Sequence, residues 1–334
     1  AFEEDGRAEY YNITSGAKGN VAIAGTFSNA GVQISQWENE RVLIIDPVKG
    51  YFTWDGNNTV SVGSISKVTI TNAGTGYTTA PNVTISATQQ TGGVNATATC
   101  TVANGSVQTI TITDAGTGYT NASNVTVTFS GGGGANAAAN VSVINQPGTA
   151  IQSFSGRVWI ANGRTVYYTA AGSYYDFTSV SAGNTILTDA TLHGNIQQLL
   201  SANNFLYIFG DDSINVFSDV RVNTSGVTLF TNTNVSASVG SRLKYAIFPY
   251  FRSVLFMNDY GVYALVGATT SKLSDPLDGV FPNIDFTKPV YAGQVLVNNI
   301  LCAAFNFYYT GVGPYPNGTP YNKYVQADRK STRL

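Results

Sequence analysis

The stretch Asn72–Ser86 reads NAGTGYTTAPNVTIS, and it returns as DAGTGYTNASNVTVT at Asp114–Thr128. Ala73 and Ala115 hold the same place in the two copies, 42 residues apart (115 − 73). Both copies lie in a segment rich in threonine, valine and glycine, whereas the flanking sequence is rich in aromatic residues. Because repetition at a fixed period indicates a structural unit used more than once, the chain divides into a two-copy module and a surrounding protein.

The module predicts strands of alternating polarity. Val68–Thr71 and Thr109–Ile112 place apolar side chains on one face and threonines on the other, which is the pattern of a half-buried strand. In each copy the Gly-Thr-Gly-Tyr sequence is typical of a tight turn. We expect each copy to be a small unit of about four short strands, and we expect two stacked copies to bury what one could not.

The sequence after the module contains hairpins at a longer period. Strand-like runs flank turn residues at Asn162-Gly163, Gly210–Ser213 and Asn258–Gly261, as expected for antiparallel hairpins. A meander that repeats every ~40–50 residues is typical of propeller blades. The repeated anchor positions of four such hairpins are Val158, Leu206, Leu255 and Leu301.

An earlier hairpin at Arg41–Trp54, with its turn at Asp46–Gly50, indicates one more blade before the module. The predicted fold is therefore all-β, with propeller-like blades of antiparallel meanders and an inserted small two-copy β-repeat domain. We expect residues 1–20 to be irregular. The predicted parts are 1–63 (N-terminal part of the propeller), 64–146 (inserted module) and 147–334 (remaining blades and C-terminal tail).

Composition argues against several classes of protein. Charged residues make up 11% of the chain and the net charge is −2, against about 25% charged residues in an average soluble protein. No run approaches the ~20 apolar residues of a membrane-spanning helix. No stripe of lysine and arginine is present to neutralise DNA phosphates; the nearest basic run is Arg329, Lys330 and Arg333. If DNA touches this protein, we therefore expect it to pass by and not to be held.

Residues that commonly carry catalysis are few and scattered. His193 is the one histidine, so this chain by itself has no multi-histidine metal site and no histidine-dependent triad. A structural role before the turn residue Gly194 is favoured. The acidic pairs Asp211-Asp212 and Asp275/Asp278 resemble the two carboxylates of a glycosidase, but turn and solvation roles are favoured for them. We predict no catalytic residue and no enzyme activity.

Metal and redox chemistry are also disfavoured. Calcium could bind oxygen-rich loops at Asp55–Asn58 or Asp211–Ser213, but neither loop has a complete ligand string. We predict no metal-binding and no cofactor-binding residue. Cys100 and Cys302 lie far apart in sequence and in different parts of the chain. Two buried thiols are favoured over a disulfide between them.

Tyr77 and Tyr119 stand at equivalent positions in the two copies, and they are the candidate interface residues of the sequence. In one interpretation they are exposed aromatics that contact a sugar or a protein. In the other, each ring packs over its own glycine turn. The recurrence of the same phrase favours the packing role, and both alternatives remain open at this point.

The outer segments resemble a family of phage proteins. The stretch Phe154–Tyr168, followed by Gly172–Phe177, is similar to a blade of the tail nozzle proteins of short-tailed bacteriophages. These proteins are also called packaged-DNA stabilisation proteins or tail tubular protein B. The segments Ile208–Phe217, Phe256–Tyr263 and Lys272–Gly279 fit the same aromatic and glycine pattern. The resemblance covers about 150–310 and 35–60, and the GTGYT repeat is similar to small β-modules inserted in many phage virion proteins.

The resemblance implies a structural virion protein, a homohexameric ring at the distal end of the tail that continues or closes the DNA-ejection channel. The implied partners are head-to-tail adaptor or portal proteins and tail fibre or needle proteins. Genomic DNA would pass through without sequence-specific binding. The expected location is the virion tail, after assembly in the cytoplasm of the host bacterium.

Two other classes of function remain as alternatives. The first is a phage receptor-binding or adhesin protein whose repeat module contacts glycan on the host surface. The second is an enzyme that acts on surface polysaccharide, and it is the least favoured because the acidic residues are scattered along the chain.

Overall fold

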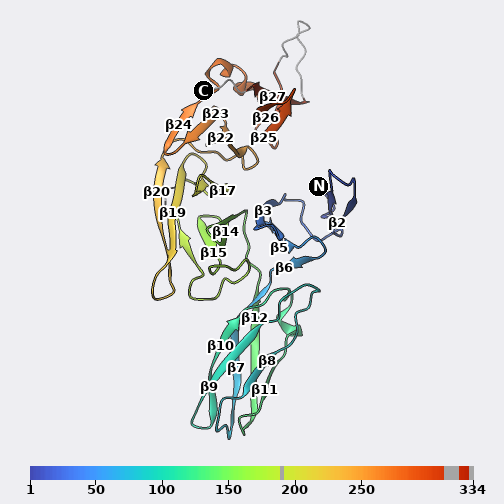
Figure 1. Cartoon of the computed structure of the whole chain (residues 1–334), viewed down its shortest axis with the longest axis vertical. Coiled ribbons are helices and arrows are strands. Elements are labelled where there is room, and N and C mark those ends of the chain that lie inside the picture. Colours follow the sequence, from blue (N-terminus) through green and yellow to red (C-terminus); the bar gives the residue numbers. More distant parts are fainter. Residues whose placement is uncertain (189–191, 312–322, 331–334) are drawn as a thin grey trace. The chain divides into compact units, whose positions relative to one another are not determined.

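The computed structural model describes residues 1–188 and 192–311, and it describes residues 323–330 as backbone (Figure 1). The predicted all-β class is confirmed, because the described residues form strands and short 3-10 helices and no α-helix. They fold into two compact units. Unit 1 comprises 1–186 and 221–229, and unit 2 comprises 187–220 and the described residues from 230 onward. The strands lie in eight sheets, none of which closes on itself in this part of the chain.

Unit 1 contains two four-stranded antiparallel sheets in which the strands follow one another in sequence order. The first sheet consists of β3 (Gln33–Trp37), β4 (Arg41–Asp46), β5 (Gly50–Trp54) and β6 (Thr59–Ser61). The second consists of β13 (Ala150–Phe154), β14 (Arg157–Asn162), β15 (Thr165–Tyr168) and β16 (Gly183–Ile186).

The two sheets bury a shared apolar core. Leu43, Ile45 and Tyr51 of the first sheet pack with Val158 and Ile160 of the second, and all five are almost completely buried. The edge strands β3 and β13 are also joined by polar contacts, since the backbone N–H of Ser153 donates to Ser35 Oγ at 3.1 Å. Both hairpins predicted from the sequence in this unit, at Arg41–Trp54 and around Asn162-Gly163, are therefore present.

The N-terminal segment is not irregular, contrary to the sequence prediction. A hairpin forms between β1 (Ala8–Tyr11) and β2 (Lys18–Ala22). Most of its side chains are exposed or half-buried, so the sequence lacks the apolar alternation by which a strand is recognised. The hairpin is held instead by the small residues Ala8 and Ala22, which are buried in a core around Phe52.

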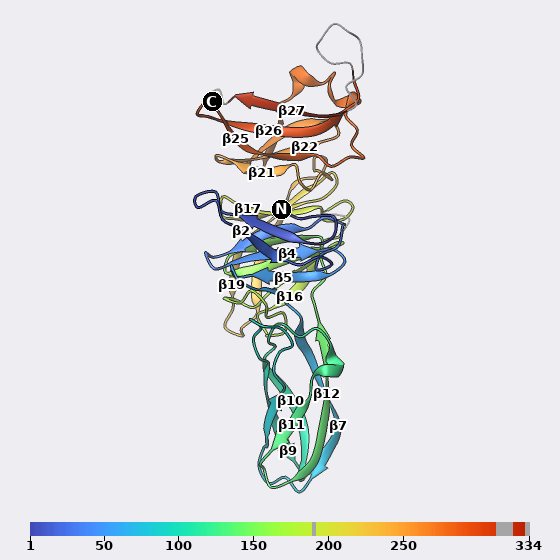
Figure 2. The same cartoon turned by 90° about the vertical axis from the view of Figure 1, so that its right-hand side faces the viewer.

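Unit 2 contains three further antiparallel sheets. Figure 2 shows the β25–β27 sheet stacked on the β21–β24 sheet, and an apolar core lies between these two sheets. Two 3-10 helices, η2 (Asp275–Leu277) and η3 (Phe281–Asn283), border that core. The strands are β17 (Gln198–Ala202), β18 (Phe205–Phe209), β19 (Ile214–Val222) and β20 (Thr228–Ser236); β21 (Ile247–Tyr250), β22 (Ser253–Asn258), β23 (Gly261–Val266) and β24 (Thr269–Lys272); and β25 (Tyr291–Val297), β26 (Ile300–Tyr309) and β27 (Lys323–Lys330).

The predicted hairpins of unit 2 are present as β18–β19 and β22–β23. The sequence did not predict the fourth strands of the sheets, β16, β20 and β24. These outer strands are short or polar, and β24 reads TTSK. An outer strand that faces solvent needs no apolar side chains on that face, so its sequence resembles a loop.

The repeat module lies within unit 1 and forms a four-stranded and a two-stranded sheet. Each copy contributes three strands, not four, because the first strand of copy 1 runs unbroken over 12 residues. The apolar faces of the two sheets enclose a core that includes Ile65, Val83 and Ala98. The strands are β7 (Ser64–Thr75), β8 (Asn82–Ile85) and β9 (Thr97–Ala103) in copy 1, and β10 (Ser106–Asp114), β11 (Val127–Ser130) and β12 (Ala135–Ile144) in copy 2, with the 3-10 turn η1 (Ala122–Asn124).

The two copies interlock rather than stack. β7 of copy 1 pairs with β12 of copy 2, β8 pairs with β11, and β9 pairs with β10. The long hydrogen-bonded ladders therefore join one copy to the other (Figure 1). One copy alone would leave backbone N–H and C=O groups at its strand edges without hydrogen-bond partners, which is the physical reason for the duplication.

Two glycines in the repeated turn are required by the backbone. Gly74 and Gly116 both have φ of +65°, in the left-handed region that other residues adopt at a cost. A Cβ atom on Gly74 would lie 2.5 Å from the carbonyl oxygen of Ala135, and on Gly116 it would lie 2.5 Å from that of Val94. The space at Gly74 is closed by the start of β12 and the space at Gly116 by the loop that leads into β9, so each glycine permits two chain segments to approach.

We predict that Gly116→Ala lowers the free energy of unfolding by roughly 2–3 kcal/mol, because the backbone strain is joined by a clash with a carbonyl oxygen. Gly131→Ala is the matched control, since Gly131 also has positive φ (+78°) but has no atom within 4 Å of an added Cβ. Urea unfolding would measure both variants. Equal losses at the two positions would contradict the role of close approach.

The predicted turn at Asp46–Gly50 is built around the Asp46 carboxylate, which is fully buried. The backbone N–H groups of Val48 and Lys49 donate to it at 2.8 Å each. The backbone N–H and hydroxyl of Ser28 donate at 2.6 and 2.8 Å. Burial alone would raise the pKa of Asp46, but these hydrogen bonds outweigh it and hold the pKa below its ordinary value of 3.8.

This geometry predicts an acid-sensitive contribution to stability. A carboxylate whose folded pKa is depressed stabilises the fold above its unfolded pKa, and that stability is lost as the pH falls below 3.8 through the folded pKa. We expect Asp46→Asn to destabilise the protein by about 1–2 kcal/mol at pH 7 and to differ less from the wild type near pH 2. Denaturant unfolding at several pH values measures this. The exposed Asp5→Asn serves as control, and a difference that does not shrink with acid would refute the assignment.

Candidate functional site: the repeat module and its anchor

The two candidate interface tyrosines lie inside the module. Tyr119 has no exposed surface and Tyr77 is 5% exposed. The hydroxyl of Tyr119 accepts from the backbone N–H of Ala96 at 2.9 Å and donates to the carbonyl oxygen of Ser86 at 3.1 Å. Burial raises the pKa of Tyr119. Rings buried in this way do not fit contact with a sugar or a partner protein, and they fit the packing role.

Each tyrosine covers the glycine turn of its own copy. A Cβ on Gly116 would lie 2.8 Å from the ring of Tyr119, and a Cβ on Gly74 would lie 2.7 Å from that of Tyr77. The glycines therefore give the rings the space in which they pack. The GTGYT phrase is a folding unit in which glycine and tyrosine depend on each other.

Backbone bonds at the tyrosines complete the interlock. The N–H of Tyr77 donates to the carbonyl oxygen of Gly105, and that of Tyr119 donates to the carbonyl oxygen of Gly63, both at 3.0 Å. Gly63 and Gly105 are themselves 42 residues apart (105 − 63). The turn of each copy is thus held by the residue that precedes the first strand of the other copy.

The outward face of β9 and β10 is a ladder of hydroxyls. The side-chain oxygens of Thr97 and Thr113 lie 2.7 Å apart, and those of Thr101 and Thr109 lie 2.6 Å apart. Asp114 is the one charged residue between positions 68 and 144. The surface of the module can therefore form neutral hydrogen bonds, but it offers little acid–base chemistry.

Asp114 anchors the module on the second four-stranded sheet of unit 1. Its Oδ1 accepts from the N–H of Gly116 at 2.8 Å and closes the turn, and its Oδ2 accepts from the hydroxyl of Tyr175 at 3.1 Å. In copy 1 the equivalent Asn72 closes the same turn, with a bond of 3.0 Å to the N–H of Gly74. Burial and the nearby Asp114 carboxylate raise the pKa of Tyr175. The two copies differ at this position because one of them meets a tyrosine hydroxyl.

An aromatic group supports the anchor. The rings of Tyr174 and Tyr175 meet edge to face with centroids 4.9 Å apart. The guanidinium of Arg41 lies 4.7 Å from the ring centroid of Tyr174, a favourable cation–π distance. The buried Tyr51 donates its hydroxyl to the carbonyl oxygen of Tyr174 at 2.9 Å. The anchor is therefore continuous with the core of the two sheets.

Amide side chains hold the segments that lead into and out of the module. Asn145 accepts from the N–H of Tyr51 at 3.0 Å and donates to the hydroxyl of Ser61 at 2.9 Å. Gln90 accepts from the N–H of Ser61 at 2.9 Å. Sequence reasoning missed these residues and Tyr175, because asparagine, glutamine and tyrosine are frequent in this chain. In the sequence, the one sign of this attachment was that the two copies differ at equivalent positions, with Asn72 in copy 1 and Asp114 in copy 2.

The remaining chemistry-bearing residues form local turn contacts. Nδ1 of His193 lies 2.9 Å from Oδ1 of Asp212, and both side chains are at least half exposed. Asp211 accepts from Gln197 at 2.8 Å. Asp275 and Asp278 lie 3.8 and 2.5 Å from Nζ of Lys272. These distances describe surface ion pairs and turn contacts, which contribute little to stability.

The candidate calcium loop at Asp55–Asn58 is a closed turn. Oδ1 of Asp55 accepts from the N–H groups of Asn57 and Asn58 at 2.9 and 2.7 Å. The hydrogen bond from Asn58 is the largest of the causes that lower the pKa of the Asp55 carboxyl. Within the described ranges, no group of three or more histidine, cysteine or acidic residues is placed to hold a metal ion. Cys302 is buried and Cys100 is half-buried, and both are free thiols.

Comparisons with protein family models and with curated proteins found no match. The described residues also contain no helix that is long and apolar enough to cross a membrane.

We predict that Tyr175→Phe and Asp114→Asn each lower the free energy of unfolding by about 1–2 kcal/mol, because the first removes the part-buried hydrogen bond between the anchor and the module and the second replaces its charged acceptor with a neutral amide. The double variant should lose less than the sum of the two, and a double-mutant cycle by urea unfolding measures this coupling. Asn72→Asp is the control in copy 1, where Asn72 has a recorded bond only to its own turn. Strict additivity would show that the Tyr175 contact carries no energy.

Proposed function

We propose that this chain is a structural virion protein that forms the tail nozzle ring of a short-tailed bacteriophage. In this proposal the ring continues or closes the channel through which DNA leaves the capsid. The chain acts as a scaffold and catalyses no reaction. Its partners are other copies of itself, head-to-tail adaptor or portal proteins, and tail fibre or needle proteins.

The observation that carries the proposal is that antiparallel meander sheets recur at a nearly constant spacing along the chain. In four of the five meander sheets the first hairpin has a two-residue turn whose first residue has φ of 51°, at Ser155, Asn203, Phe251 and Asn298. These turns are 48, 48 and 47 residues apart (203 − 155, 251 − 203, 298 − 251). Three of these sheets are four-stranded meanders and the last has three strands in the described residues, and repetition of a meander at this period is what a blade architecture requires.

The order of the strands supports the same interpretation. In unit 2 the first strand of one sheet contacts the first strand of the next, because β17 contacts β21 and β21 contacts β25. In unit 1, β3 contacts β13 in the same manner. Radial repetition of four-stranded sheets places such first strands next to one another around an axis. We therefore interpret the sheets as propeller blades, one of them followed by the inserted module.

The charge of the chain suits a duct for DNA. Lysine and arginine number 17 in 334 residues, and retention of a duplex needs many phosphate contacts from such residues. A channel wall with few lysines and arginines lets DNA pass without sequence-specific binding. The outward hydroxyls of the module keep that part of the protein hydrated without adding charge.

Electron microscopy of the native assembly tests the proposal. We expect six copies in a ring on the tail axis, and native mass spectrometry of the purified chain should show hexamers or their precursors. A three-fold spike or a peripheral position would overturn the nozzle proposal and favour the receptor-binding alternative. A dense lining of lysine and arginine around the channel would refute the account of DNA passage.

A further inference from the structure

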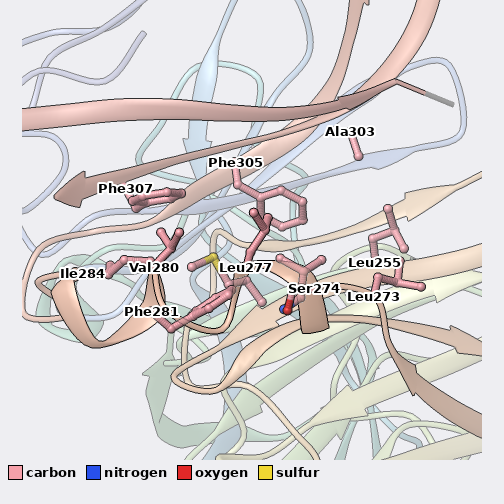
Figure 3. A pocket seen from close by; sticks show the side chains of 12 residues that line it. Leu255, Leu273, Ser274, Leu277, Val280, Phe281, Ile284, Ala303, Phe305 and Phe307 are labelled. Carbon is pink, nitrogen blue, oxygen red and sulfur yellow. The ribbon is translucent and has the colours of Figure 1, made fainter. Parts of the chain in front are cut away.

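Unit 2 contains an apolar cavity of about 160 Å³ between the β21–β24 sheet and the β25–β27 sheet (Figure 3). Its walls come from β22, β23 and β26, and from the segment that carries η2 and η3. The lining residues are Leu255, Met257, Val262, Leu273, Ser274, Leu277, Val280, Phe281, Ile284, Ala303, Phe305 and Phe307.

One wall of the cavity is formed by three residues of β26. On β26, Ala303, Phe305 and Phe307 project toward the same side, since side chains alternate along a strand. Figure 3 shows the rings of Phe305 and Phe307 on this wall, and it shows the small Ala303 side chain nearer to Leu255 and Leu273, which also line the cavity. A larger side chain at position 303 would occupy part of the cavity.

The lining discriminates against polar guests. Among the residues around the cavity, Ser274 alone has a polar side chain, and its Oγ already accepts from the backbone N–H of Val262 at 2.9 Å. A charged or amide-bearing guest would lose its hydrogen bonds to water without replacement, which is unfavourable. An apolar guest gains contact with methyl groups and aromatic faces.

The segment between η2 and η3 carries the one lining residue that is exposed, and we take this segment as the entrance to the cavity. Leu277 lines the cavity and is 49% exposed, and Val280 lines it and is partly buried. Gly279 lies between them, and an added Cβ there would meet no atom within 4 Å. An apolar group can therefore enter at this segment without displacing a strand.

We propose that this cavity is a binding site for an uncharged apolar group of about the size of a substituted benzene ring. An apolar cavity of roughly 150 Å³ is known to take benzene in another protein, so the volume and lining here suit the same chemistry. The group can belong to a free hydrophobic molecule or to an aromatic side chain presented by a protein. Binding holds the two sheets together, whether or not the chain forms a ring.

Toluene and the full-length chain provide the test. A ligand that binds only the folded state stabilises it by mass action, so toluene should raise the midpoint of thermal unfolding in a concentration-dependent manner. Benzamidine carries the same ring with a charge and should give no such shift. N-acetyl-phenylalanine amide presents the ring on a backbone. Stabilisation by this compound as well as toluene shows that the entrance admits a protein side chain, and stabilisation by toluene alone shows that the guest is a free molecule; both results support the site.

Variants locate the binding. Ala303→Leu fills the cavity and should weaken toluene binding by roughly tenfold or more, a change of at least 1.4 kcal/mol, without lowering the unfolding midpoint of the free protein. Ala268→Leu is the matched control, because Ala268 is exposed in the same unit and lies outside the lining. Val280→Trp at the entrance is a second variant that leaves the strands untouched. The proposal fails if toluene gives no shift, if benzamidine gives an equal one, or if both variants bind toluene as the wild type does.

Discussion

Burial of both faces of the central strands is the constraint on which the sheets of this protein depend. In β4, β14, β18 and β22, four or five consecutive residues are buried. A strand buried on both faces needs a covering layer on each side. A single four-stranded sheet cannot supply these layers, so successive sheets pack face to face with shared cores. The repeated meander is stable as one member of a series.

The inserted module meets the same requirement by a different route. Its strands are half-buried, and every strand of copy 1 has a partner in copy 2, while β8 and β9 of copy 1 also pair with each other at Val83 and Ala98. Pairing distant strands costs conformational entropy, because the chain between them must close into a loop. Both copies share one core, so burial of that core offsets this entropy for the whole module. The module is then attached to its neighbour through polar residues, because Asp114 and Asn145 bond to Tyr175 and Tyr51 and Gln90 bonds to the backbone of Ser61.

The candidate roles of the protein rest on different parts of the chain. The repeated sheets, with their two-residue turns and adjacent first strands, support the nozzle proposal. The apolar cavity is a local property of two of these sheets. The module contributes a hydroxyl surface and a single anchoring carboxylate. These features lie in different parts of the described chain and do not converge on one site.

The sequence by itself determined the all-β class, the duplication and the predicted hairpins, because these depend on neighbours close along the chain. Alternation of apolar residues and the φ preferences of glycine and asparagine are local properties. Irregular structure was wrongly predicted for residues 1–20, since the β1–β2 hairpin is held by two buried alanines and not by a visible pattern. Strands β16 and β24 were missed for a related reason, because their side chains face solvent.

Only the tertiary structure decided how these elements meet. Interlocking of the copies, in place of stacking, depends on ladders between strands up to about 80 residues apart (144 − 64). Burial of Tyr77 and Tyr119, the contact of Asp114 with Tyr175, and the space beside Ala303 all depend on which distant side chain lies opposite. Such contacts have no local signature, because the same residue is a solvated turn residue or a buried anchor according to what packs against it.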